Sequence, residues 1–146
     1  MPFDTPTSTQ LSQVIAQVTA PAFLLGAVAA FISVLIARMN RIVDRSQALN
    51  AISDDNPDKA QLKADIPRLK RRAALLNKSI LFAIISAIIT AVLVIVAFVA
   101  AYLELPHEYG VGFFFILALG FFTASLVNLA RETLVALHDY DHFSSS

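Results

Sequence analysis

The sequence predicts an all-α membrane protein with three transmembrane helices, of which the first two extend into a cytoplasmic antiparallel helical hairpin. Three apolar runs without charged residues predict the spans: residues 20–37, 79–103 and 109–130. About 20 apolar residues in a helix cross a hydrocarbon core of roughly 30 Å. Ten of the eleven Lys and Arg residues lie in residues 38–78, between the first two runs. Because Lys and Arg near span ends stay in the cytoplasm, this stretch predicts an outer N-terminus and a cytoplasmic C-terminus.

Composition excludes several classes of function. The chain has no Cys, which excludes disulfides, thiolate metal sites and cysteine nucleophiles. The three apolar runs contain no Asp, Glu, Lys, Arg or His. Because proton relays, ion-coupled transporters and voltage sensors place ionisable groups inside the membrane, this absence argues against those classes.

Residues 1–19 predict a polar outer lead followed by a short amphipathic helix. They contain no Lys or Arg, which disfavours a cleaved signal peptide. Thr7 and Gln10 have the spacing of a capping box at a helix start. This helix either lies on the membrane or runs straight into the first span, and Pro21 favours a bend between the two.

Two apolar seams predict the hairpin of residues 38–78. Both keep a 4-3 spacing, so the two helices can pack as in an antiparallel coiled coil. Pro67 interrupts the second seam, and we expect a kink or a restart of the helix at residues 65–67, with Asp65 as the cap. A restart would give one helix from about Pro67 to Leu103. The turn is expected at residues 53–57, and Asp55 and Lys59 are expected to form a helical i, i+4 pair of opposite charge. The seam residues are Leu35, Met39, Ile42, Ser46 and Leu49, then Leu62, Ile66, Leu69, Ala73, Leu76 and Ile80.

Small residues at four-residue spacing recur along the predicted spans. Such stripes let helix backbones approach closely in lipid, either within one chain or between subunits. We therefore expect a homo-oligomer or a subunit of a larger membrane complex. The candidate packing residues are Gly26, Ala30, Ala83, Ala87, Gly120 and Ala124.

Two basic clusters mark the membrane ends of the hairpin. Basic residues just inside a membrane attract anionic lipid headgroups, at about 1 kcal/mol each. The simpler interpretation is that these residues only fix the topology of the spans. The more specific interpretation is that they bind membrane lipid or a cytoplasmic partner. Nothing in the sequence indicates nucleic-acid binding. The candidate residues are Arg38, Arg41, Arg45, Arg68, Lys70, Arg71 and Arg72.

Other polar and aromatic residues give weaker hypotheses. Ser86, Thr90 and Asn128 either bond neighbouring helices or, alternatively, line a pore. A cluster of Phe residues between positions 113 and 122 is typical of packing or lipid-facing surface, with a pigment or quinone site as the alternative. His138 and His142 are four residues apart, but two ligands do not make a metal site.

The outer turn and the tail complete the predicted organisation. Residues 104–108 form a short outer turn without Lys or Arg, and residues 131–146 form a cytoplasmic tail. No acid–base or nucleophile–base pair occurs at membrane depth, so we expect no enzyme activity and no cofactor.

The segments 21–25, 38–45 and 66–80 resemble a known family. Pro-Ala-Phe-Leu-Leu begins the first span, Arg-Met-Asn-Arg-Ile-Val-Asp-Arg follows that span, and Ile-Pro-Arg-Leu-Lys-Arg-Arg leads into the second. In these motifs, and from about Val14 to Ala130, the chain is similar to the bacterial domain-of-unknown-function 2721 family of small three-span membrane proteins. The resemblance implies a bacterial cytoplasmic membrane, and it implies no activity and no site residues.

These observations predict a non-enzymatic structural or accessory subunit of a membrane assembly. Its basic hairpin is expected to contact anionic lipid or a cytoplasmic partner. The alternative is a homo-oligomeric ion or small-solute channel.

Overall fold

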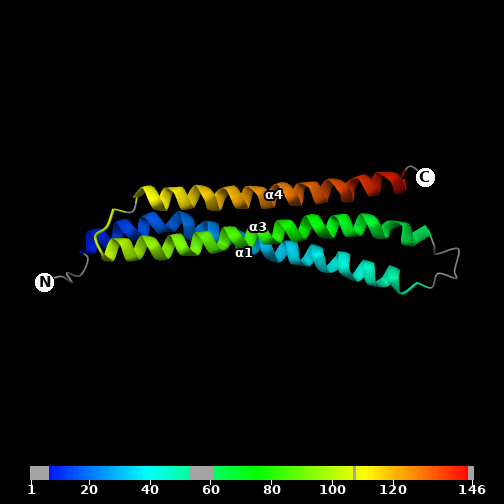
Figure 1. The fold of residues 1–146 in the computed structure, drawn as a ribbon, viewed down its shortest axis with the longest axis horizontal. Coiled ribbons are helices and arrows are strands. Elements are labelled where there is room, and N and C mark those ends of the chain that lie inside the picture. Colours follow the sequence, from blue (N-terminus) through cyan, green and yellow to red (C-terminus); the bar gives the residue numbers. More distant parts are fainter. Residues whose placement is uncertain (1–6, 53–60, 107, 145–146) are drawn as a thin grey trace. The chain divides into compact units, whose positions relative to one another are not determined.

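Three long helices make up most of the protein (Figure 1). The computed structural model describes residues 7–52, 61–106 and 108–144. Within them, helix α1 runs over Ser8–Asn50, the 3₁₀ helix η1 over Gln61–Asp65, α3 over Ile66–Tyr102 and α4 over Glu108–Ser144. Each of the three α-helices contains a window long and apolar enough to cross a membrane. The protein is therefore an all-α membrane protein with three candidate spans, as predicted.

The chain divides into two units, each with a segment from all three long helices. Unit 1 comprises Met1–Phe31 and Ala83–Thr123, and unit 2 comprises Ile32–Phe82 and Ala124–Ser146. Unit 2 contains the two helical segments of the predicted hairpin. Its expected turn at residues 53–57 and the Asp55–Lys59 pair lie outside the described residues.

Helix α1 begins with the predicted capping box. The Thr7 amide donates to Oε1 of Gln10 at 3.1 Å, and the Gln10 amide donates to Oγ1 of Thr7 at 3.3 Å. These reciprocal bonds satisfy two amides that the first helical turn leaves without a partner. The helix is continuous through Pro21. The structure thus joins residues 8–19 to the first span without a break, which is one of the two arrangements that the sequence allowed.

Helix α3 starts where Pro67 predicts a restart. Asp65 ends η1, and the α-helix begins at the next residue, Ile66. Proline is tolerated in a first turn because its missing N–H would have no partner there. From this start α3 runs without interruption to Tyr102, which confirms the expected long helix.

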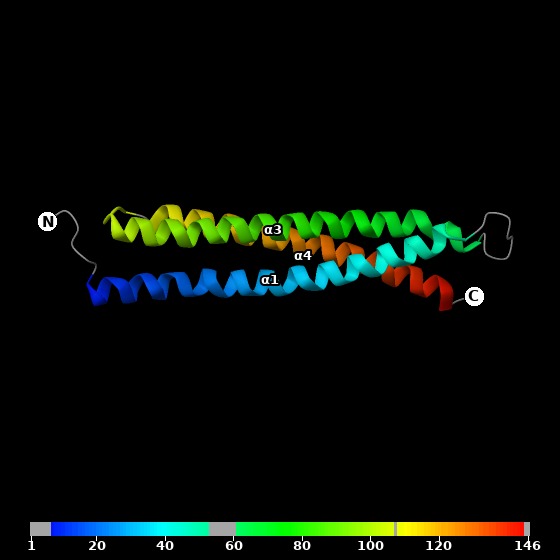
Figure 2. The same ribbon diagram turned by 90° about the horizontal axis from the view of Figure 1, so that it is seen from below.

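In unit 2, α1 and α3 pack through the predicted seams. Leu35, Ile42 and Leu49 are buried at a strict seven-residue spacing on α1, and Leu69 and Leu76 are buried at the same spacing on α3. Both views show the two helical segments side by side near the ends that the hairpin joins (Figure 1, Figure 2). A strict seven-residue repeat keeps one apolar face toward the partner helix. Leu62 is the exception among the predicted seam positions, since 37% of its surface is exposed.

The same spacing continues in unit 1 with smaller residues on α3. Its buried positions include Ala83, Thr90 and Ala97 on α3 and Val28 on α1. An edge-to-face ring pair joins α1 to α4. The ring centroids of Phe31 and Phe122 are 5.5 Å apart, and the ring planes meet at 89°. Small side chains on α3 allow close approach of the neighbouring helices, as is common for helices in lipid.

A Schellman motif ends α3 in the outer turn. The Leu105 amide donates to the Ala100 carbonyl at 2.9 Å, and the Glu104 amide donates to the Ala101 carbonyl at 3.3 Å. Glu104 has φ 54°, the left-handed conformation that this motif requires and that glycine adopts with least strain. The motif stops the helix and reverses the chain before α4 begins at Glu108.

Candidate functional site

Two serine contacts join α3 to α4. In unit 1, the Ser86 hydroxyl donates to the Ala118 carbonyl at 2.7 Å. In unit 2, the Ser79 hydroxyl donates to the Ser125 carbonyl at 2.6 Å, and the Ser125 hydroxyl donates to the Ser79 carbonyl at 2.6 Å. Each serine is fully buried. From one contact to the next, the residue number decreases by seven on α3 and increases by seven on α4. Two antiparallel helices require such opposite directions.

A buried carboxylate follows at the next step of seven. Oε1 of Glu132 on α4 accepts a hydrogen bond from Nε of Arg72 on α3 at 2.9 Å. Its Oε2 accepts from Nε of Arg38 on α1 at 3.0 Å and from an Nη of the same residue at 2.5 Å. The Glu132 side chain is 0% exposed, whereas 32% of Arg38 and 24% of Arg72 remain exposed. We call these three residues the Glu132 clamp, because one carboxylate joins all three helices of unit 2.

The clamp balances a buried charge with two partly hydrated ones. An unpaired buried carboxylate would cost several kcal/mol of desolvation. Arg38 donates two of the bonds to one oxygen and Arg72 donates to the other, so both oxygens have charged partners. Two guanidinium groups against one carboxylate leave a formal excess of one positive charge in the clamp.

A second feature of unit 2 is a basic pocket between α3 and α4. It has a volume of about 440 Å³ and is lined by Arg68 and Arg71 from α3 and by Leu134, Val135 and His138 from α4. The lining residues that the structure describes thus combine basic side chains with an apolar wall.

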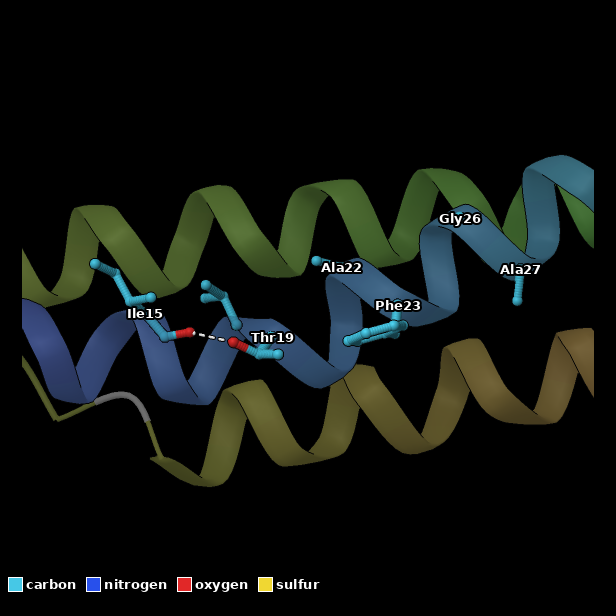
Figure 3. Close-up of a pocket in the computed structure, with 7 residues that line it drawn as sticks. Ile15, Thr19, Ala22, Phe23, Gly26 and Ala27 are labelled. Atoms are coloured by element: carbon cyan, nitrogen blue, oxygen red, sulfur yellow. Dashed lines mark hydrogen bonds between the residues drawn. The ribbon is translucent and has the colours of Figure 1, made fainter.

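An apolar groove runs along α1 in unit 1. It has a volume of about 730 Å³. Figure 3 shows its lining side chains following one another along this single helix, with the Thr19 hydroxyl bonded to the Ile15 carbonyl at 2.8 Å. Of the predicted packing residues the groove contains Gly26, where an added Cβ would meet no atom within 4 Å. The lining residues are Ile15, Val18, Thr19, Ala22, Phe23, Gly26 and Ala27.

Comparison with known proteins identifies the family. A family model described as "Protein of unknown function (DUF2721)" matches residues 18–142. The chain belongs to this family. The match confirms the resemblance drawn from the basic motifs, and it covers α1 from residue 18, all of α3, and α4 up to residue 142. No curated protein and no solved structure matches the chain.

This DUF2721 protein divides its predicted basic residues into two groups. Arg38 and Arg72 face Glu132, and their guanidinium groups bond its carboxylate. The other five candidates are exposed in unit 2. Contact of any of the seven with lipid or a partner stays a prediction, and the geometry favours the exposed group for it. The exposed candidates are Arg41, Arg45, Arg68, Lys70 and Arg71.

The predicted packing residues also fall into two groups. Ala83 is buried and Ala87 and Ala124 are half-buried, so these contribute to packing within their units. Gly26, Ala30 and Gly120 are exposed. An added Cβ at Gly26 on α1 or at Gly120 on α4 would meet no atom within 4 Å, so both helices are open at these positions.

The polar residues proposed for a pore are turned inward. Ser86 and Thr90 are fully buried in unit 1, where the Thr90 hydroxyl donates to the Ser86 carbonyl at 2.8 Å. Asn128 is buried in unit 2 and donates to the Ala124 carbonyl at 3.0 Å. Side chains buried within one chain cannot line a pore between chains without rearrangement. The channel hypothesis therefore stays a prediction, and nothing in this geometry favours it.

The histidines of the C-terminal segment lie on a helix. Helix α4 continues to Ser144, so His138 and His142 occupy positions four apart on one face. In the part of the chain that the structure describes, no cluster of three or more metal-ligating side chains occurs.

Glu132 is the residue that sequence reasoning missed. It lies two residues beyond the third apolar run, at the start of the predicted tail of residues 131–146. A signal was nevertheless present, because Ala118, Ser125 and Glu132 are seven residues apart and continue one buried face of α4. Three polar or small residues at the spacing of a helical core indicate an inward-facing acid.

Proposed function

We propose that this DUF2721 protein is a non-enzymatic structural or accessory subunit of a membrane assembly, and that its basic hairpin contacts anionic lipid. The exposed basic surface of unit 2 is the observation that carries the proposal. The buried polar side chains of the described residues all have hydrogen-bond partners within the chain. The exposed surface of these residues consists mainly of apolar helix faces and the basic side chains of the hairpin.

Charge supports lipid as the contact of the hairpin. Residues 38–78 carry ten basic and five acidic side chains. Each basic residue near an anionic membrane surface contributes about 1 kcal/mol to binding, and this attraction falls off within a Debye length of roughly 8–10 Å. The alternative is that the hairpin contacts a cytoplasmic protein. Binding experiments with purified lipid distinguish between these two contacts.

The open groove on α1 supports membership of an assembly. Ala22, Gly26 and Ala30 are exposed at four-residue spacing in unit 1. Small residues allow a second helix to approach closely, and van der Waals packing is the main source of association in lipid. Either a second copy of the chain or another membrane protein can supply that helix.

Purification in mild detergent, followed by native mass measurement, tests membership of an assembly. We expect a complex larger than one chain, and Gly26→Leu should disrupt it by filling the groove. Gly112→Leu is the matched control, because Gly112 is also exposed and also has no atom within 4 Å of an added Cβ. Detection of single chains alone, without any copurifying protein, would contradict the proposed role.

The proposed orientation places the hairpin in the bacterial cytoplasm. Since the chain has no Cys, single cysteines give a clean labelling signal. Ala48→Cys near the exposed end of α1 should react with a membrane-impermeant maleimide only after the cells are opened. Tyr109→Cys, at a position 95% exposed, should react in intact cells once the outer membrane is made permeable. The reverse pattern would place the basic hairpin outside and contradict the topology.

A further inference from the structure

We infer that Lys78 on α3 and Arg131 on α4 together bind the phosphate of an anionic phospholipid at the cytoplasmic surface of the membrane. This inference rests on the proposed function, from which it takes the orientation of the chain and the contact with lipid. It adds a defined place for one lipid, and Arg131 lies outside the hairpin. Neither residue is among the seven basic candidates that the sequence predicted.

Both residues lie at the depth of lipid headgroups. Lys78 directly precedes the apolar run of residues 79–103, and Arg131 directly follows the run of residues 109–130. Both side chains are exposed in unit 2. A headgroup layer extends roughly 5–8 Å beyond the hydrocarbon on each side of a membrane. Residues that border an apolar run therefore meet the phosphates of that layer.

The register of α3 against α4 places the two cations within reach of one phosphate. The ion pair of Arg72 with Glu132 makes these two residues level, and residue 73 on α3 is consequently level with Arg131. Lys78 lies five positions further toward the membrane, or roughly 7.5 Å along the helices. Side chains on a helix tilt toward its N-terminus. Because the two helices are antiparallel, Lys78 tilts toward the cytoplasm and Arg131 toward the membrane, so each tilts toward the other.

Helix periodicity places both residues on one side of the α3–α4 pair. Arg71 on α3 and His138 on α4 line the same pocket between these helices. Lys78 follows Arg71 by seven residues, and Arg131 precedes His138 by seven. Seven residues make nearly two full turns, so each residue lies almost directly above its counterpart on the helix face. The two cations thus belong to the same groove as the pocket, one step of seven nearer the membrane.

An apolar surface continues from these cations into the membrane. Phe82 follows Lys78 by four residues, and Val127 precedes Arg131 by four, so each shares a face with its cation. Phe82 is half-buried, and 47% of Val127 is exposed. Acyl chains can contact this surface while the phosphate meets the cations. A free inorganic phosphate would gain nothing from it, which favours a lipid as the ligand.

The surrounding charge favours an anionic lipid over a zwitterionic one. In the part of the chain that the structure describes, neither Lys78 nor Arg131 has a carboxylate partner. Glu132 follows Arg131 directly, but its side chain is fully buried and bonds two arginines. The other acids of the described part of unit 2 lie at least six residues beyond the clamp, or roughly 9 Å further from the membrane. These acids are Asp44, Asp65, Asp139 and Asp141.

The test measures which lipid lies beside Val127 in vesicles of phosphatidylcholine with a smaller share of phosphatidylglycerol. Since the chain has no Trp, Val127→Trp supplies a single fluorophore, and bromine on the acyl chains of one lipid quenches it on contact. We expect quenching by brominated phosphatidylglycerol to exceed the share of that lipid in the vesicles. Adding K78Q/R131Q should lower the relative affinity for phosphatidylglycerol roughly 30-fold, at about fivefold per basic residue. Adding R41Q/R45Q instead makes the same change of charge at exposed hairpin positions and should leave the quenching nearly unchanged.

Each other outcome overturns a stated part of the inference. Quenching that follows the vesicle composition, or equal losses in K78Q/R131Q and R41Q/R45Q, would remove the site. Inorganic phosphate that displaces the brominated lipid would remove the lipid assignment. K78R/R131K keeps both charges, so a loss as large as that of K78Q/R131Q would contradict a role of charge. The helix content of each variant, measured by circular dichroism, should equal that of the wild type because the four substituted residues are exposed.

A second measurement separates failure of this site from failure of the proposed function. Native mass spectrometry of the full chain in mild detergent counts the phosphatidylglycerol and phosphatidylcholine molecules that it binds. A preference for phosphatidylglycerol that R41Q/R45Q abolishes and K78Q/R131Q preserves would overturn the site and leave the hairpin contact standing. No preference between the two lipids would overturn both.

Discussion

Glu132→Leu is expected to destabilise unit 2 by about 3 kcal/mol. The change removes the carboxylate and leaves Arg38 and Arg72 facing each other without an anion between them. Breaking a buried ion pair by removing one partner typically costs about 3–5 kcal/mol. The lower end applies here because a quarter to a third of each arginine side chain is exposed and can gain some hydration. Loss of helicity in mixed micelles of increasing dodecyl sulfate content measures the free energy of unfolding.

A graded series separates the charge of Glu132 from its shape. Glu132→Gln keeps the side-chain length and one carbonyl acceptor, and it should cost about 2 kcal/mol through the loss of charge-assisted bonds. The triple variant R38M/R72M/E132L removes all three charges and should recover most of the stability. Replacement of a complete buried ion network by apolar side chains of similar volume is often neutral or stabilising. Recovery in the triple variant would show that the unpaired arginines, and not the missing carboxylate itself, cause the loss.

Arg131→Leu is the matched control for the clamp. Arg131 precedes Glu132 on the same helix, is charged and is exposed. An exposed substitution away from specific contacts changes stability by less than about 0.5 kcal/mol. If Glu132→Leu and Arg131→Leu had equal effects, the carboxylate would not hold the three helices together.

The long helices could be predicted from the sequence because their signals are local and repeated. The capping box of Thr7, the restart at Pro67 and the seven-residue spacing of Leu35, Ile42 and Leu49 each depend on neighbours in the chain. The structure confirms all three. Such signals survive because helix geometry converts sequence spacing directly into position on a face.

The clamp could not be predicted in the same way because it depends on contacts between distant parts of the chain. Arg38 and Glu132 are 94 residues apart, and Arg72 and Glu132 are 60 apart. An acid that lies two residues beyond an apolar run is typical of the membrane surface, where it would be hydrated. Its burial requires that both arginines turn inward at the same level, and local spacing does not determine this.

The small residues of the spans show a similar limit to prediction from sequence. Gly26 and Ala83 both belong to four-residue stripes, yet Gly26 is exposed and Ala83 is fully buried. The spacing indicates that a face permits close approach, but it does not indicate whether the partner helix belongs to the same chain. The exposed stripe that contains Gly26 is therefore assigned to contacts within the proposed assembly, whereas Ala83 packs against helices of its own chain.

Leu49→Ala is expected to cost about 2–4 kcal/mol and to loosen the hairpin first. Leu49 is 2% exposed and ends the buried series on α1. A buried Leu→Ala substitution loses transfer free energy and leaves a cavity, at about 2–5 kcal/mol in total. The upper end is not expected, because a site so near the end of α1 can close part of the cavity. Hydrogen exchange of the amides of α1 between Leu35 and Asn50 should accelerate before exchange in the apolar spans.

Leu62→Ala provides the comparison for this substitution. Both variants make the same chemical change in the same unit, and the sequence places both leucines on the seams. Leu62 is 37% exposed, so less of its surface leaves water on folding than at Leu49, and its loss should cost about 1–2 kcal/mol. Equal effects of the two variants would mean that the seam extends through η1 to Leu62. A large effect of Leu49→Ala alone would show that the stabilising packing of the hairpin seam ends between Leu49 and Leu69, beside the arginines of the basic pocket.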